Sequence, residues 1–197
     1  MTAVATSTGR LSPEDLLSLP DLGRYEGLID GELQERHMSV ESSHTSWETS
    51  GQVRNYLTAH PLGWGFTTDC GLQIFPWRPK LVRFSDGGFY RKSRGPRPGH
   101  GHLKIAPDLV IEVVSPGDDA EDLETKVQDY LRAGVQMIWV AFPFTRTVAV
   151  YRLNGSVTRL QASETLEGED VLPGFSTPVA SLFLPPDEDE DDADADE

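Results

Sequence analysis

Two acidic side chains interrupt an apolar stretch in the middle of the chain. Residues 107–116 read PDLVIEVVSP, in which Asp108 and Glu112 stand among Leu, Val and Ile. In an extended strand every second side chain points to the same face, so Asp108, Glu112 and Val114 share one face. We therefore expect the two carboxylates to sit side by side on a strand whose other face is apolar.

A lysine on the next element could join them. Residues 120–133 have the pattern of an amphipathic helix that ends at Gly134. Its buried stripe is formed by residues at i, i+4, i+7 and i+8, which are Leu123, Val127, Tyr130 and Leu131. Lys126 lies at the edge of this stripe. If the helix folds back over the strand, the Lys126 ammonium can reach Asp108 and Glu112.

Two carboxylates and a lysine suit phosphodiester hydrolysis. Oxygen ligands favour a hard cation such as Mg²⁺, which takes one or two carboxylates directly and keeps several waters. Such a metal makes bound water more acidic and neutralises the charge that develops on a phosphate. The lysine would orient that water or stabilise the transition state.

The same residues also have a purely structural interpretation. Asp108 follows a proline and could cap a turn, while Glu112 and Lys126 could form a structural salt bridge. Lys126 could also extend along the helix and keep its ammonium in solvent. Spacing alone leaves the catalytic and the structural interpretations open.

The surrounding elements are predicted to position this strand and helix. Ser12, Pro13 and the acids after them predict a short helix through Leu19 that Pro20 ends. Asp30-Gly31 predicts a tight hairpin turn within residues 23–38. The further expected elements are a helix over 42–60, two or three strands of a meander over 63–90, strands over 135–142 and 147–153, and a further hairpin and a closing segment within 155–183.

This order of elements predicts an α/β (α+β) fold, with one mixed central sheet flanked by helices and an N-terminal hairpin and helix. A single domain over residues 11–184 is long enough for a sizeable core. Residues 1–10 and 185–197 hold little that could pack, so we expect both ends to be disordered. An alternative role for the acidic tail is to compete with nucleic acid for a basic surface.

Composition excludes several classes of protein. No stretch is apolar enough for a membrane span or a signal peptide, which predicts a cytoplasmic location. Cys70 is the single cysteine, so an internal disulfide and a cysteine-based zinc site are excluded. The net charge of −15 opposes contact with nucleic acid, but nine of the 32 acidic residues lie in residues 187–197.

Several blocks of sequence occur in an order that is specific, although each block alone is weak. They are YEGLIDGELQE, SHTSW, PDLVIEVVSP, Lys126 with Tyr130, AGVQMIWV and VLPGFSTPVASLF. Together, over residues 24–183, they resemble the Uma-two family of putative restriction endonucleases, a branch of the PD-(D/E)XK nuclease superfamily. The resemblance implies a restriction-endonuclease-like core and a DNA substrate. It also implies Mg²⁺ as the cofactor, with Mn²⁺ as a substitute, and, by analogy, a homodimer.

The resemblance further implies an acidic cluster with one lysine. The second acid of the family pattern maps to Glu112, and the lysine position two residues later falls on Val114, which cannot do this work. The lysine is then Lys126, displaced to the following helix. The first aspartate maps to Asp86 or to Asp108. We therefore take Asp86, Asp108 and Glu112 as metal ligands and as catalytic residues with Lys126.

The surroundings of Asp86 depart from the family pattern. Ser85 stands where the family has proline, and Gly87-Gly88 stand where it has apolar strand residues. This departure supports an alternative function. The chain would then be an interaction module that kept the nuclease fold with a weakened or inactive site.

Other residues are secondary candidates. Glu32 and His44 match an acidic and a histidine position of the family and could assist the site, or could be a surface hairpin glutamate and a helix-capping histidine. We interpret the aromatic residues Trp47, Trp64 and Trp139 as core residues rather than as base-stacking platforms. Residues 91–102 form a basic loop, which is either a phosphate-contacting arm or a solubilising insertion; its cations are Arg91, Lys92, Arg94 and Arg97.

Overall fold

The computed structural model describes residues 10–20, 25–35, 37, 39–68 and 70–186. The expected disorder of the two ends falls almost wholly on residues 1–9 and 187–197, which lie outside the described residues. Within the described part, none of the helices is long and apolar enough to cross a bilayer.

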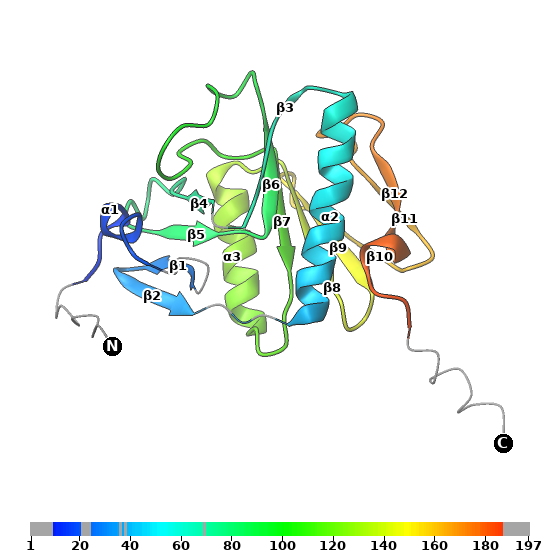
Figure 1. The fold of residues 1–197 in the computed structure, drawn as a ribbon, viewed down its shortest axis with the longest axis horizontal. Coiled ribbons are helices and arrows are strands. Elements are labelled where there is room, and N and C mark those ends of the chain that lie inside the picture. The colour runs from blue at the N-terminus through cyan, green and yellow to red at the C-terminus, as the bar shows by residue number, and fades with distance from the viewer. Residues whose placement is uncertain (1–9, 21–24, 36, 38, 69, 187–197) are drawn as a thin grey trace.

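A six-stranded mixed sheet forms the centre of the fold (Figure 1). Its strands, in spatial order, are β10 (Val157–Leu160), β9 (Thr147–Arg152), β8 (Met137–Phe142), β7 (Leu109–Val113), β6 (Gly87–Arg91) and β3 (Gly63–Thr67). Only β7 and β8 run parallel among these neighbours. A parallel pair needs a long crossover, and α3 (Ala120–Ala133) supplies it.

Two helices cover opposite faces of this sheet. Leu109, Ile111 and Val113 of β7 pack in the core cluster that contains Val53 of α2 (Val40–Ala59). Val110 packs in the other cluster, with residues of α3. Figure 1 shows α2 and α3 flanking β6 and β7. The alternation along β7 therefore sends Glu112 to the α3 side, as the sequence predicts.

Local signals in the sequence explain how the two helices begin and end. Ser39 and Ser42 form a capping box at the start of α2. The Asp119 side chain accepts hydrogen bonds from the first backbone N–H groups of α3, and Gly134 ends the helix with a positive φ of 93°. The bounds predicted for α3 are confirmed, while α2 begins two residues earlier than the predicted helix.

A second sheet holds the N-terminal part. Its strand order is β2 (Glu32–Glu35), β1 (Tyr25–Ile29), β5 (Val82–Phe84) and β4 (Gly71–Leu72). The Asp30-Gly31 turn is confirmed, with φ values of 51° and 87° at the two residues. The helix α1 (Pro13–Leu16) is shorter than predicted. The single meander predicted over 63–90 is wrong, because β5 pairs with β1 of the hairpin and with β4, while β3 and β6 join the central sheet.

The C-terminal segment closes the core on the α2 side. It consists of a small sheet of β11 (Thr165–Glu167) and β12 (Ser176–Pro178), followed by the 3-10 helix η2 (Val179–Leu182). Val179 and Leu182 are fully buried in the same cluster as Val53. The further hairpin and the closing segment predicted within 155–183 are thus confirmed.

Candidate functional site

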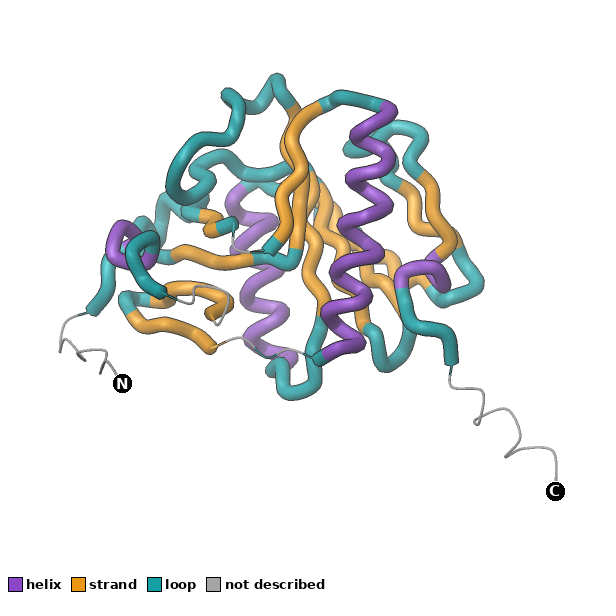
Figure 2. The backbone as a smooth tube through the Cα atoms, in the orientation of Figure 1, coloured by secondary structure: helices purple, strands orange, loops and turns teal. Residues whose placement is uncertain are grey.

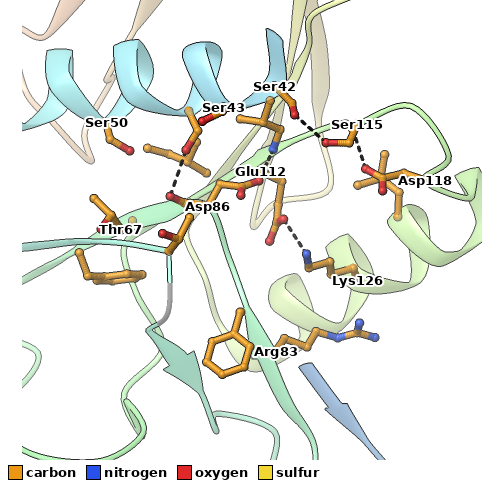
Figure 3. A pocket seen from close by; sticks show the side chains of 18 of the residues that line it. Ser42, Ser43, Ser50, Thr67, Arg83, Asp86, Glu112, Ser115, Asp118 and Lys126 are labelled. Atoms are coloured by element: carbon orange, nitrogen blue, oxygen red, sulfur yellow. Dashed lines mark hydrogen bonds and ion pairs between the residues drawn. The ribbon is translucent and has the colours of Figure 1, made fainter. Parts of the chain in front are cut away.

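A cavity of about 1030 Å³ lies between α2, the end of β7 and the start of α3. Asp86, Glu112 and Lys126 all line it, and we call these three residues the acid–lysine group (Figure 3). They come from the turn before β6, from β7 and from α3. The wall formed by α2 carries small side chains, among them Ser43, Ser46 and Ser50, which leave room in front of the group.

Glu112 is held on both of its oxygens. Lys126 Nζ donates to Oε2 at 2.7 Å, and the Tyr130 hydroxyl donates to Oε1 at 2.8 Å. Only 3% of Glu112 is exposed. The pKa of Glu112 is raised to about 7, chiefly by burial and in smaller part by the charge of Asp86, while the charge of Lys126 opposes this increase. At neutral pH this carboxyl group is therefore poised between its acid and its ionised form.

Asp86 is fixed by the backbone of β7. Its Oδ2 accepts a hydrogen bond of 2.7 Å from the N–H of Val113, the residue after Glu112. Because β6 pairs with β7, this turn brings Asp86 to the same end of the sheet as Glu112. The proximity of the two carboxylates is also what couples their charges. The structure thus brings together Asp86, Glu112 and Lys126.

Close packing explains why glycines occupy the two positions after Asp86. A β-carbon on Gly88 would collide with the ring of Phe66 and with the Leu109 carbonyl, and one on Gly87 would press on Ser50 Oγ. Glycine is therefore required where β3, β6 and α2 meet. The departure from the family pattern at Gly87-Gly88 is accounted for by close packing and does not displace Asp86.

Asp108 lies away from the group, so the expectation that Asp108 and Glu112 sit side by side is wrong. Asp108 accepts from Arg94 Nε at 2.9 Å and from the Arg91 N–H at 2.8 Å, at the start of β7. Four residues of extended chain span about 13 Å, so two side chains can share a face and still be far apart. Asp108 is absent from the cavity wall and holds the base of the loop after β6.

The basic loop also lies at the far end of the sheet. Figure 2 shows the loop that leaves β6 at the end opposite to the passage from β7 into α3. Arg91 donates hydrogen bonds to the carbonyls of Asp170 and Val171, and Arg94 donates a hydrogen bond to the Asp108 carboxylate. Two of its four cations therefore stabilise the fold, whereas Lys92 and Arg97 are exposed.

The auxiliary candidates do not reach the group. Glu32 is exposed at the start of β2 and does not line the cavity. His44 lines a separate outer hollow on α2, together with Ser39, Val40, Ser43 and Trp47. Neither residue lines the cavity that holds the acid–lysine group.

The tryptophans divide into different environments. Trp139 is 1% exposed, which confirms its place in the core. Trp64 is half-buried against Tyr90, with ring centroids 5.5 Å apart. Trp47 is 71% exposed on α2, so its assignment to the core is wrong. The physical reason is that α2 is rich in Ser and Thr and has a weak apolar stripe, so helical spacing did not identify its buried face.

Sequence reasoning missed the role of Tyr130 as a donor to Glu112. Tyr130 is fully buried, one turn after Lys126 on α3. From the sequence it was placed in the apolar stripe and, with Lys126, among the blocks of the family resemblance, but its hydroxyl was given no role. A tyrosine in such a stripe usually finds a partner for its hydroxyl, and this rule is the signal that could have identified it.

The charges around the cavity favour a cation. The acidic residues on its wall are Glu35, Asp86, Glu112, Asp118, Asp119 and Asp122. The basic ones are Arg54, Arg78, Arg83 and Lys126, and all but Arg54 form ion pairs with carboxylates. Negative potential in a cleft concentrates cations.

The donor set fits magnesium or manganese. Among the described residues, no group of three or more His, Cys, Asp or Glu side chains could hold a metal ion. Two carboxylates, from Asp86 and Glu112, remain. Mg²⁺ is commonly held by one or two carboxylates, with water and substrate phosphate as its other ligands. The residues present therefore fit such an ion without Asp108, contrary to the expected set of three protein ligands.

Comparisons with known proteins agree with this fold. A family model described as "Uma2: Putative restriction endonuclease" matches residues 13–180. No curated protein sequence matches the chain. A crystal structure of a putative nuclease belonging to DUF820 from Anabaena variabilis is similar, with a TM-score of 0.71 and 20% sequence identity, covering 88% of this chain and 97% of that one. At this identity the likeness confirms the predicted fold.

Proposed function

The chain belongs to the Uma2 family of putative restriction endonucleases, and from this premise we propose that it is a metal-dependent endonuclease that hydrolyses DNA phosphodiester bonds. The observation that carries the proposal is the buried contact of Lys126 with Glu112 on the wall of the cavity, next to Asp86. A lysine beside two carboxylates suits phosphodiester hydrolysis, because the carboxylates can hold a metal ion and the ammonium can stabilise charge on the phosphate.

Asp86 and Glu112 would hold Mg²⁺, or Mn²⁺ in its place. When bound, the ion supplies Lewis acidity, which makes water more acidic and neutralises charge on the phosphate. Glu112 must be ionised to serve as a ligand, and its raised pKa makes this step a proton release near neutral pH. The Tyr130 hydroxyl keeps the carboxylate oriented while the proton leaves.

Lys126 has two roles in this proposal. Its ammonium compensates the charge of Glu112 at 2.7 Å inside a buried site. It also lies at the cavity wall, where it can donate to a phosphate oxygen and stabilise the charge of the transition state. The position of Lys126 on α3 thus substitutes for the lysine that the resemblance places at Val114.

The test is cleavage of plasmid and single-stranded DNA by the purified protein with Mg²⁺ or Mn²⁺. We expect nicking by the wild type and a loss of at least about a hundredfold in Lys126→Ala and Glu112→Gln, with unchanged circular dichroism. Lys92→Ala, which removes an exposed lysine that does not line the cavity, is the matched control and should cleave like the wild type.

The alternative of an inactive interaction module makes the opposite prediction. It requires that both DNA substrates stay intact and that calorimetry detects no bound Mg²⁺ or Mn²⁺. Metal binding that disappears in Glu112→Gln would exclude it.

A further inference from the structure

Helix α2 presents an indole at the mouth of the cavity. Trp47 is 71% exposed and lines both the cavity and the outer hollow beside it. Burial of an aromatic side chain of this size stabilises a protein, and an exposed one gives up that gain. An exposed tryptophan on the wall of the same cavity as the acid–lysine group is therefore a candidate contact for a ligand.

The surface next to this indole is open. Gly51 lies one turn after Trp47 and also lines the cavity. A β-carbon at Gly51 would have no atom within 4 Å. Glycine inside a helix lowers its stability relative to alanine, and here no packing contact requires it. The space beside the indole can accept a flat group.

The acid–lysine group is recessed behind this opening. Glu112 is 3% exposed and Asp86 is 8% exposed. A duplex keeps its bases stacked and its phosphates on the outside of a stiff helix, so it cannot bend deeply into a cavity. A single strand is flexible and offers the faces of its bases to aromatic side chains.

Arg54 lies on the same wall of α2. It is exposed, lines the cavity and follows Trp47 by two helical turns, or about 10 Å along the axis. It donates to the side chain of Asn55, a contact at the surface. A strand whose base covers the indole could therefore place a phosphate against the Arg54 guanidinium.

We propose that the cavity takes a single-stranded or locally unpaired stretch of nucleic acid, one base of which stacks on Trp47 in the space over Gly51. This proposal rests on the proposed function for the class of substrate. A second copy of the chain is the other occupant to test, because the neighbouring Val40 is 84% exposed. Nucleic acid is favoured because Trp47 shares a cavity with the acid–lysine group.

The experiment measures binding rather than cleavage. Fluorescence anisotropy of a labelled oligothymidylate and of a hairpin duplex is recorded with the full chain in EDTA. We expect the single strand to bind more tightly than the duplex, and Trp47→Ala to weaken it by about tenfold or more. Trp47→Phe should retain part of the affinity. Gly51→Leu should weaken binding because its side chain fills the space for the base.

Phe144→Ala is the matched control. Phe144 is 95% exposed in the turn between β8 and β9 and does not line the cavity, so its removal should leave binding unchanged. Equal affinities of Trp47→Ala and Phe144→Ala would overturn the proposal. The proposal would also be overturned if sedimentation showed that the wild type is a dimer and that Trp47→Ala is a monomer. Binding that depends on Trp47 but is not followed by cleavage would overturn the proposed nuclease activity and leave this binding site standing. Cleavage together with binding that does not depend on Trp47 would overturn this binding site and leave the nuclease activity standing.

Discussion

Lys126 Nζ, on α3, lies 2.7 Å from Glu112 Oε2, on the preceding strand β7. The parallel pairing of β7 and β8 is the cause, because the crossover must lay α3 back over the face of β7 that carries Glu112. The contact joins one oxygen of a buried carboxylate to a cation at the cavity wall, so the charge on Glu112 and the charge on Lys126 affect one another.

Metal affinity should rise with pH. The pKa of Glu112 is raised to about 7, and a ligand carboxyl group must lose its proton before it binds a cation. We expect affinity for Mn²⁺ to increase by up to about tenfold per pH unit below pH 7 and to level off above it. Calorimetry in two buffers of different ionisation enthalpy measures the protons released. Binding without proton release at about pH 6 would contradict this role of Glu112.

Removal of the lysine charge should cost more stability at high pH than at low pH. Below the folded pKa of about 7, Glu112 is mostly protonated and needs no cation. Since that pKa lies above the unfolded value, the stability contributed by the protonated carboxyl group is lost as pH rises through about 7. Without the charge of Lys126 the pKa of Glu112 rises further, so the loss of folding stability continues to higher pH.

We therefore expect Lys126→Met to lower the free energy of unfolding by about 3 kcal/mol at pH 9 and by under about 1 kcal/mol at pH 5.5. Urea denaturation at both pH values measures this difference. Lys92→Met, at an exposed position of the basic loop, should have little effect at either pH. A penalty for Lys126→Met that does not change with pH would show that packing, not charge, dominates the contact.

The sequence could identify this pair but not the whole site. The spacing along β7 and α3 determines which face each side chain takes, and that was enough for Glu112 and Lys126. It does not determine the distance along a strand, so Asp108 was grouped with Glu112 although about 13 Å of chain separates them. Asp86 was named only through the family resemblance, because its position beside Glu112 depends on the pairing of β6 with β7, a long-range contact that spacing along one segment does not reveal.

The two aspartates should separate stability from activity. Asp108→Asn removes the charge that pairs with Arg94 at 2.9 Å, and Asp108 does not line the cavity. We expect it to lower the free energy of unfolding by about 2 kcal/mol while cleavage and metal affinity stay near wild type. Asp86→Asn should instead abolish metal binding, because one of two carboxylate ligands is lost.

Thermal unfolding and metal calorimetry on the two aspartate variants check this prediction. A loss of metal affinity in folded Asp108→Asn would restore Asp108 to the site. Retained affinity in Asp86→Asn would remove Asp86 from it.

A lysine placed just after the end of β7, at Val114, should replace Lys126. Val114 follows Glu112 by two residues, so it points to the same face about 7 Å further along the chain, and it packs on the α3 side. A lysine at Val114 can therefore reach Glu112 from the strand. We expect Val114→Lys combined with Lys126→Ala to recover roughly a tenth of wild-type cleavage, well above Lys126→Ala alone.

Val114→Met combined with Lys126→Ala is the control for this rescue. It supplies a long unbranched side chain without charge, and so it should stay as inactive as Lys126→Ala. Plasmid nicking under identical metal concentrations compares the variants, with circular dichroism to verify the fold. If the double variant with the lysine folds but cleaves no better than this control, the ammonium must approach from α3, because only there does it meet both Glu112 and the space in front of the cavity wall.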